Sequence, residues 1–213
     1  MNAKPAFQAR RAGLRFIGAL LLLGCVKQPE PPMVMSPPVR GVVLPADSAY
    51  FPAGVLPRWR VLYSRYLAAM GEPPLDRFAD SADVAAVRLL WLRSFHVPMA
   101  VRLMKRGDHY ALIGVALGPP VDDRPGAVTR RDSLPLDARV WQLLTKPLEK
   151  EEFWRADSTF GLDGAQWMIE HVSSDRYRAD DWWTPSAEYG TEHIRSFGLA
   201  LLRRTRFDLG PVY

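Results

Sequence analysis

The residues best placed to do chemistry lie in and just after segment 161–170, which reads GLDGAQWMIE. Glu170 closes this segment, and Tyr177 would lie near it if the two flanking stretches pair as a hairpin. A carboxylate beside a phenol can transfer protons in a cleft that excludes water. With Asp163 in the turn before the first strand, these residues form a candidate hydrolytic set. The alternative is a solvent-facing cross-strand pair, which is common in sheets and does no chemistry.

Other side chains of this region are candidates for binding. Side chains alternate along a strand, so Gln166 shares one face with Glu170, while Trp167 lies on the other face in the core. Trp182 and Trp183 are adjacent on the next predicted strand, so one is expected in the core and the other at the surface. An exposed Trp183 could stack on a sugar or on a partner's side chain. The alternative is that the protein covers both rings.

The spacings of established catalytic and metal sites do not occur in the sequence. No H-x-H or H-x-x-x-H pair is formed by the four histidines, which are His96, His109, His171 and His193. No serine stands in G-x-S-x-G, and neither a P-loop nor G-x-G-x-x-G is present. The sequence therefore predicts neither a metal nor a cofactor. It favours a non-catalytic binding or scaffolding role over a hydrolase that uses the carboxylates and the tyrosine.

Two sequence patterns follow one another in a characteristic order. Residues 163–170 read DGAQWMIE, and Tyr177 is followed by the triplet WTP at 183–185. These patterns resemble an uncharacterised family of bacterial proteins that pairs DGxxWxxE with Y…W[ST]P. The resemblance covers roughly residues 58–205 and implies no particular activity. Arg178 stands where that family often has histidine, so this chain would lack that histidine if it were catalytic.

The first 25 residues have the pattern of an exported and lipidated protein. Residues 1–15 carry basic side chains and no acidic ones, residues 16–24 are largely apolar, and Cys25 follows. A basic start, a short apolar stretch and a small residue before the cut are typical of a secretory signal peptide. Residues 22–25, Leu-Leu-Gly-Cys, resemble the lipobox of bacterial lipoproteins. The resemblance implies that residues 1–24 are removed and that the Cys25 thiol and the new amine are acylated.

The same resemblance implies where the protein resides. Two or more acyl chains hold a protein firmly on a bilayer, whereas one alone does so weakly. In Gram-negative lipoproteins an aspartate after the cysteine often signals retention in the inner membrane. Val26 therefore implies the outer membrane, with the body facing the periplasm. The alternative is an incidental cysteine behind an ordinary signal peptide.

The charge of the chain excludes one class of partner. The net charge is +5, but residues 1–24 carry four of these positive charges, so the remainder is nearly neutral. A neutral body gains little from releasing the counterions of a nucleic acid. We therefore expect no nucleic-acid partner, and we expect the membrane and an envelope protein as partners instead.

Proline is dense between the cysteine and the body. Residues 25–57 hold eight prolines, which block helices and favour an extended chain. We interpret this segment as a tether that holds the body off the membrane. The alternative is a docking motif, for which the single P-x-x-P at 29–32 is the one indication.

Residues 58–213 have the length and patterning of one folded domain. Apolar spacing predicts helices at 59–70, 137–148 and 188–205. Alternation and turn signals predict strands at 85–95, 97–104, 110–117, 164–172 and 176–183, and a surface loop at 118–132. Most of these strands are joined as hairpins. The predicted fold is therefore a single α+β domain with an antiparallel sheet of about five strands and about three helices.

Overall fold

The computed structural model describes residues 50–155, 161–174 and 176–213. The predicted signal peptide, Cys25 and the tether up to residue 49 lie outside these residues. The described residues form one antiparallel sheet with helices, which confirms the predicted α+β class. The sheet has six strands rather than about five.

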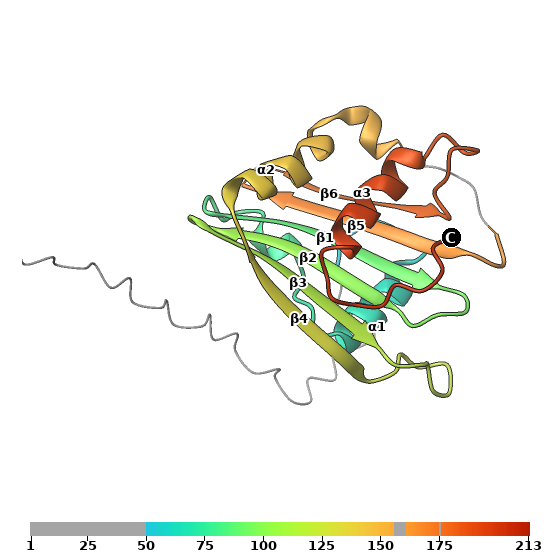
Figure 1. Cartoon of the computed structure of the whole chain (residues 1–213). Helices are drawn as coiled ribbons and strands as arrows, with labels where there is room; N and C mark the ends of the chain where they lie inside the picture. Colours follow the sequence, from blue (N-terminus) through green and yellow to red (C-terminus); the bar gives the residue numbers. More distant parts are fainter. Residues whose placement is uncertain (1–49, 156–160, 175) are drawn as a thin grey trace, which may run out of the picture. The chain divides into compact units, whose positions relative to one another are not determined.

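The strands are ordered β4-β3-β2-β1-β5-β6 across the sheet (Figure 1). Their bounds are Val84–Arg93 (β1), Met99–Arg106 (β2), His109–Leu117 (β3), Val128–Leu136 (β4), Ala165–Ser173 (β5) and Arg176–Trp183 (β6). Every neighbouring pair is antiparallel, and four of the five pairs are consecutive in the chain. The exception is β1 with β5, which places the 161–170 segment beside the most central apolar strand.

Helices cover both faces of this sheet (Figure 1). One face carries α1, which spans Arg60–Ala69, and the 3-10 turn η1 at Asp76–Phe78. The other face carries α2 at Ala138–Thr145, α3 at Glu192–Leu202, and two 3-10 turns, η2 at Lys146–Glu149 and η3 at Glu151–Trp154. Because both faces are covered, β1 and β5 are buried on both sides. This explains why β1 is a nearly continuous apolar run instead of an alternating one.

The chain leading into α1 belongs to the folded body. Tyr50, Phe51 and Leu56 are buried, and Arg60 donates a hydrogen bond of 3.1 Å to the carbonyl oxygen of Phe51. Proline density predicts that the tether ends at residue 57. Apolar side chains override that signal in the last part of the segment, because they find a core to enter.

The surface loop predicted at 118–132 is wrong from residue 128 onward. Residues 128–136 form β4, an edge strand whose side chains are mostly exposed. Its charged residues and Pro135 resemble loop composition, yet both are tolerated at the edge of a sheet and discourage pairing with further strands. The prediction failed because residues 128–133, the first part of this strand, show no apolar alternation.

Local signals explain the positions of α2 and α3. Asp137 caps α2, since the backbone N–H of Val140 donates to its Oδ1 at 2.7 Å. Pro147 lies just after α2 and within η2, where it cannot continue an α-helix. The last helix is shorter than predicted, at 192–202 instead of 188–205. Among the residues described, no helix combines the length and apolarity needed to cross a membrane.

Candidate functional site

Glu170 and Tyr177 meet as the sequence predicts. They lie on β5 and β6, and the Tyr177 hydroxyl donates a hydrogen bond of 2.7 Å to Oε1 of Glu170. The second carboxylate oxygen, Oε2, accepts a short hydrogen bond from Nη2 of Arg88 on β1. Glu170 and Arg88 are both fully buried, on the face of the sheet that carries α1. The pair is therefore not solvent-facing.

Arg88 connects this pair to a second one. Its Nη1 lies 3.6 Å from Oε2 of Glu72 and donates to the carbonyl oxygen of Pro73 at 2.6 Å. Oε2 of Glu72 also accepts from Nε of Arg102 at 2.8 Å. Two arginines and two glutamates thus balance in charge inside the protein. We call these four residues, with Tyr177, the buried charge network.

Sequence reasoning found two members of this network and missed three. One sequence feature could have indicated the missed members: Arg88 and Arg102 each interrupt an apolar strand. Charged residues are buried only when they are paired. An arginine inside an apolar strand therefore requires a buried acid, but Glu72 follows α1 in a loop, and its position could not be deduced.

The network is poorly arranged for acid–base chemistry. Burial raises the pKa of Glu170, while attraction to Arg88 and the hydrogen bond from Tyr177 oppose the increase. Burial and the neighbouring Glu170 raise the pKa of Tyr177. Tyr177 therefore remains a protonated donor, and both oxygens of Glu170 already have partners. The network instead joins β1, β2, β5, β6 and the loop after α1.

Asp163 does not join this network. It lies in the exposed turn before β5, seven positions before Glu170. At about 3.3 Å per residue, an extended strand of that length spans roughly 20 Å. The three candidate residues are therefore not assembled as one catalytic set.

Gln166 faces the same side of the sheet as Glu170, as predicted, but its amide is used internally. Its Nε2 donates to Oδ2 of Asp181 on β6. The same oxygen accepts a hydrogen bond of 2.7 Å from the hydroxyl of Tyr63 on α1. Burial raises the pKa of Asp181, and the hydrogen bonds from Tyr63 and Gln166 oppose that increase. Asp181 thus joins α1 to the sheet, and Gln166 holds the Asp181 carboxylate in place.

The two adjacent tryptophans have different environments. Trp182 is fully buried against η3, and its Nε1 donates to the carbonyl oxygen of Arg155 at 3.1 Å. Trp183 is half-buried and lies over the backbone of Gly161 and Gly164. A Cβ atom on those glycines would come within 2.3 and 2.8 Å of its indole ring. The turn that leads into β5 therefore packs closely against the Trp183 ring.

Two titratable groups on the opposite face of β5 and β6 have shifted pKa values. Burial, with a contribution from Arg176, lowers the pKa of His171 from 6.5 to about 4. His171 stacks on Trp154, with ring centroids 6.4 Å apart. Burial raises the pKa of Asp180 from 3.8 to about 6, against the attraction of Arg178. The two shifts oppose each other between pH 4 and 6.

We expect the two pKa shifts to have opposite and nearly cancelling effects on the pH dependence of stability in the wild type. A variant that removes one of the two groups should reveal the effect of the other. Stability from neutral His171 is lost as the pH falls from 6.5 to 4, because the unfolded state binds the proton more readily. Stability is gained at Asp180 as the pH falls from 6 to 3.8, because the folded state binds that proton. Between pH 7 and 4.5, Asp180→Asn should lose about 2 kcal/mol more unfolding free energy than the wild type. His171→Gln should shift by a similar amount in the opposite direction.

Urea denaturation at the two pH values measures this difference. Equal pH dependence in the wild type and both variants would show that His171 and Asp180 titrate normally.

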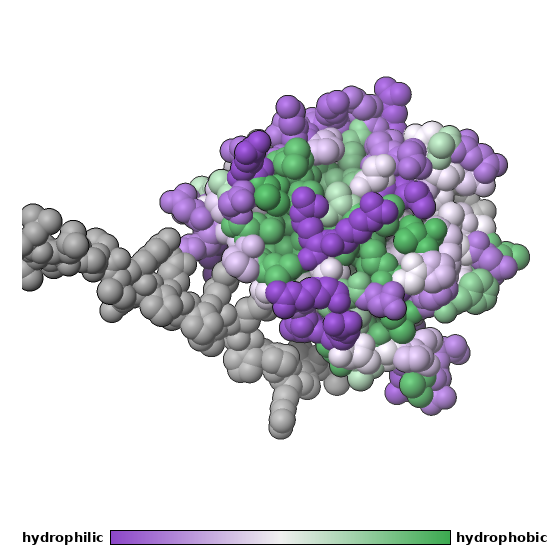
Figure 2. All heavy atoms as spheres, viewed as in Figure 1, coloured by the Kyte–Doolittle hydropathy of each residue, from purple (hydrophilic) through white to green (hydrophobic). Residues whose placement is uncertain are grey.

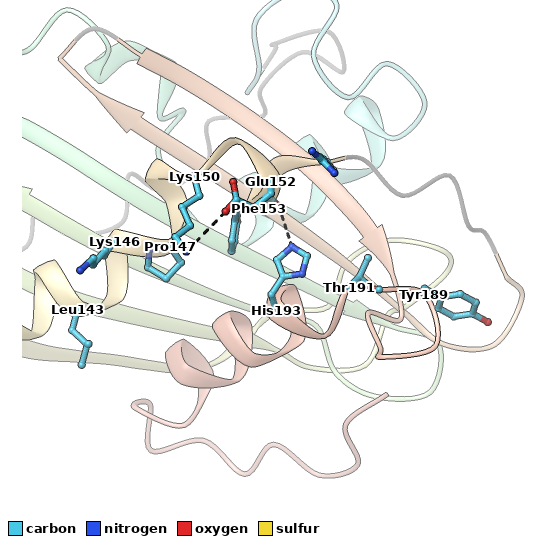
Figure 3. Close-up of a pocket in the computed structure, with 11 residues that line it drawn as sticks. Leu143, Lys146, Pro147, Lys150, Glu152, Phe153, Tyr189, Thr191 and His193 are labelled. Atoms are coloured by element: carbon cyan, nitrogen blue, oxygen red, sulfur yellow. Dashed lines mark hydrogen bonds and ion pairs between the residues drawn. The ribbon is translucent and has the colours of Figure 1, made fainter.

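The structure also forms a groove that sequence reasoning did not anticipate. It lies between the segment 143–155, which covers the end of α2 with η2 and η3, and the segment 189–193 at the start of α3 (Figure 3). Its volume is about 760 Å³. The aromatic ring of Phe153 is buried beneath it, while Leu143 and Tyr189 are 66% and 46% exposed beside it.

The charged side chains that line this groove are mostly cationic. Lys146, Lys150 and Arg155 line it, with Glu152 and His193. On the face that carries α2 and α3, hydrophobic residues lie open among hydrophilic ones (Figure 2). Local contacts hold the lining in place, since Nε1 of Trp154 donates to the carbonyl oxygen of Leu148 at 2.8 Å. No single sequence motif indicates this groove, because two distant segments form it.

Comparison with known proteins gives no identity. No protein-family model matches the chain, and no curated protein matches its sequence. Within the described residues, no three histidine, cysteine or acidic side chains are grouped so that they could hold a metal ion.

Proposed function

We propose that this protein is an envelope lipoprotein with a non-catalytic binding domain, and that the groove between 143–155 and 189–193 is its binding surface. The observation that carries the binding role is the groove itself: about 760 Å³, with Leu143 and Tyr189 left exposed beside it. Pockets of this size that combine apolar walls with a few polar groups are typical of ligand sites.

The contrast with Glu170 favours binding over hydrolysis. A general acid or base must reach the substrate through hydrogen-bond distance. Glu170 is fully buried, and both of its oxygens bind side chains of the protein. The groove lies on the opposite face of the sheet and is open. The groove is thus accessible to a ligand, whereas the candidate catalytic carboxylate of Glu170 is not.

The membrane attachment rests on the leader and on Cys25. A basic start, nine mostly apolar residues and the lipobox-like Leu-Leu-Gly-Cys support acylation of that thiol. The acyl chains would keep the domain within reach of one membrane surface through the proline-rich segment. A binding domain on such a tether meets envelope ligands at a raised local concentration.

A photo-crosslinking experiment in cells tests the binding surface. A photoreactive amino acid replaces Leu143 in the groove in one strain and Val61 on α1 in another. Val61 is a matched control, because it is also helical and is 59% exposed on the other face. We expect a defined crosslinked species in the envelope fraction from position 143 and not from position 61. Crosslinks of equal pattern from both positions would contradict the binding surface.

The same strains, grown with an alkyne-labelled fatty acid, test the anchor. Wild-type protein should carry the label and sediment with membranes, because several acyl chains anchor a protein firmly. Cys25→Ser should lose the label completely and retain the leader. A labelled Cys25→Ser protein, or an unlabelled wild type, would contradict lipidation at this residue.

A further inference from the structure

We infer that the groove binds a single-chain anionic amphiphile, which is a molecule with one acyl or alkyl chain and a carboxylate or phosphate head. This inference rests on the proposed binding function and specifies its ligand class. The chain of the ligand would lie over Phe153 and Leu143, and its head would lie among the cationic side chains.

The apolar half of the groove suits a hydrocarbon chain. Phe153 is 3% exposed and packs edge-to-face on Phe197 and His193, so its position is fixed. Pro147 and Leu143 extend the apolar surface along η2 and α2 (Figure 3). Leu143 is among the most exposed large apolar residues that the structure describes. A chain laid over Leu143 and Pro147 removes their exposed apolar area from water, which stabilises the complex by about 25 cal/mol per Å², while the buried Phe153 forms the floor beneath it.

The cationic half of the groove suits an anion. Lys150 and Glu152 form an exposed ion pair of 3.9 Å and largely neutralise each other. Neither Lys146 nor the Arg155 side chain forms an ion pair within the described part of the chain. The groove thus keeps an excess of positive charge. An anionic head would be attracted to it, and a cationic head would be repelled.

The start of α3 adds donors at the same place. Thr191 and His193 line the groove, and no side chain caps this end of the helix. The Thr191 hydroxyl is engaged elsewhere, since it accepts from the backbone N–H of Ser186 at 3.0 Å. Backbone N–H groups at a helix start carry partial positive charge and favour anions. This supports the orientation in which the head points towards α3.

The size of the groove favours an amphiphile over a protein partner. A stable protein interface buries about 800 Å² on each partner. A volume of about 760 Å³ falls instead in the range of about 300–1,000 Å³ that is usual for small-molecule pockets. One chain with a compact head fills such a space, and a folded domain does not enter it.

Calorimetric titration with three matched probes tests the inference. The protein is the full chain with Cys25→Ser, which removes its own acyl chains. The probes are dodecyl phosphate, dodecyl maltoside and inorganic phosphate, with both dodecyl compounds below their critical micelle concentrations. We expect dodecyl phosphate to bind once per chain and at least about ten-fold more tightly than the neutral maltoside. Inorganic phosphate, which lacks the chain, should bind too weakly to measure.

Variants locate the binding and separate the outcomes. Lys146→Gln with Arg155→Gln should weaken binding of dodecyl phosphate about ten-fold. The matched control, Arg106→Gln with Arg124→Gln, removes two exposed arginines outside the groove and should change nothing. Equal affinity for phosphate and maltoside, or an unaffected groove variant, would overturn the inference. If the calorimetric results contradict the inference while position 143 still crosslinks in cells, then the inferred ligand class is wrong and the proposed binding surface is retained.

Discussion

Replacing Glu170 with glutamine should lower the free energy of unfolding by about 3–5 kcal/mol. Glutamine keeps the shape of the side chain and can still accept the hydrogen bond from Tyr177. It removes the charge opposite Arg88, which is fully buried and cannot turn to water. The nearest remaining carboxylate is Glu72, 3.6 Å from Arg88, but it is already bound to Arg102 at 2.8 Å. Breaking one member of a buried ion pair leaves an uncompensated charge, and that is its main cost.

A control and a rescue distinguish this explanation from a general loss of packing. Glu151→Gln removes a carboxylate that accepts a hydrogen bond from Arg178 at 2.7 Å on the surface, and should cost little. Adding Arg88→Met to Glu170→Gln removes one charge of each sign and leaves Glu72 with Arg102. The double variant should therefore be less destabilised than the sum of the two single variants. Urea denaturation measures all four, and an effect at Glu170 as small as that at Glu151 would refute the buried charge network.

The contact between Glu170 and Tyr177 was predictable because it depends on short-range rules. Alternation along β5 and a tight connection to β6 place the two side chains on one face. The sequence could not show that this face is covered. Its cover comes from α1 and from Glu72, which lie about 100 residues earlier in the chain. Local patterns thus predicted the pair but not whether it is exposed to water. Exposure decides whether a carboxylate can reach a substrate.

The groove was beyond prediction for a related reason. Its lining comes mostly from two 3-10 turns and a loop, which have no periodic signature. Each cationic side chain that lines it has an acidic residue within three positions in the sequence, so the pattern is typical of an ordinary solvated surface. Only the approach of residues 189–193 turns that surface into a groove.

Edge strand β4 was missed because its charged residues match those of a loop.

The fold divides its polar groups between the two faces of the sheet. On the α1 face, the buried charge network and the Tyr63–Asp181–Gln166 contacts use polar atoms to fix elements to one another. On the other face, α2, η2, η3 and α3 rest mostly on apolar contacts and leave Lys146 and Arg155 exposed. Disrupting the first face should therefore affect stability, and disrupting the exposed cations of the second should affect binding.

Gly198→Ala should lower the free energy of unfolding by about 2 kcal/mol, although alanine is normally the better helix former. Gly198 lies in α3 directly over Trp167. A Cβ atom there would come within 2.3 Å of Cζ3 of Trp167 and 3.3 Å of Cδ2 of Leu89. Trp167 has no space to retreat, because it is fully buried and its ring centroid lies 5.2 Å from that of Trp91. The helix must therefore move away from the sheet.

Thermal denaturation measures this effect as a fall of several degrees in the melting temperature. Ser196→Ala is the matched control: it lies on the exposed side of the same helix, and its higher helix propensity should leave stability unchanged or slightly increased. Trp167→Phe makes room at the contact, so Gly198→Ala should cost less in that background than in the wild type. If Gly198→Ala instead stabilised the protein as Ser196→Ala does, α3 would not pack against Trp167 as closely as described. The start of α3 forms one side of the groove, so the same displacement should also weaken binding there.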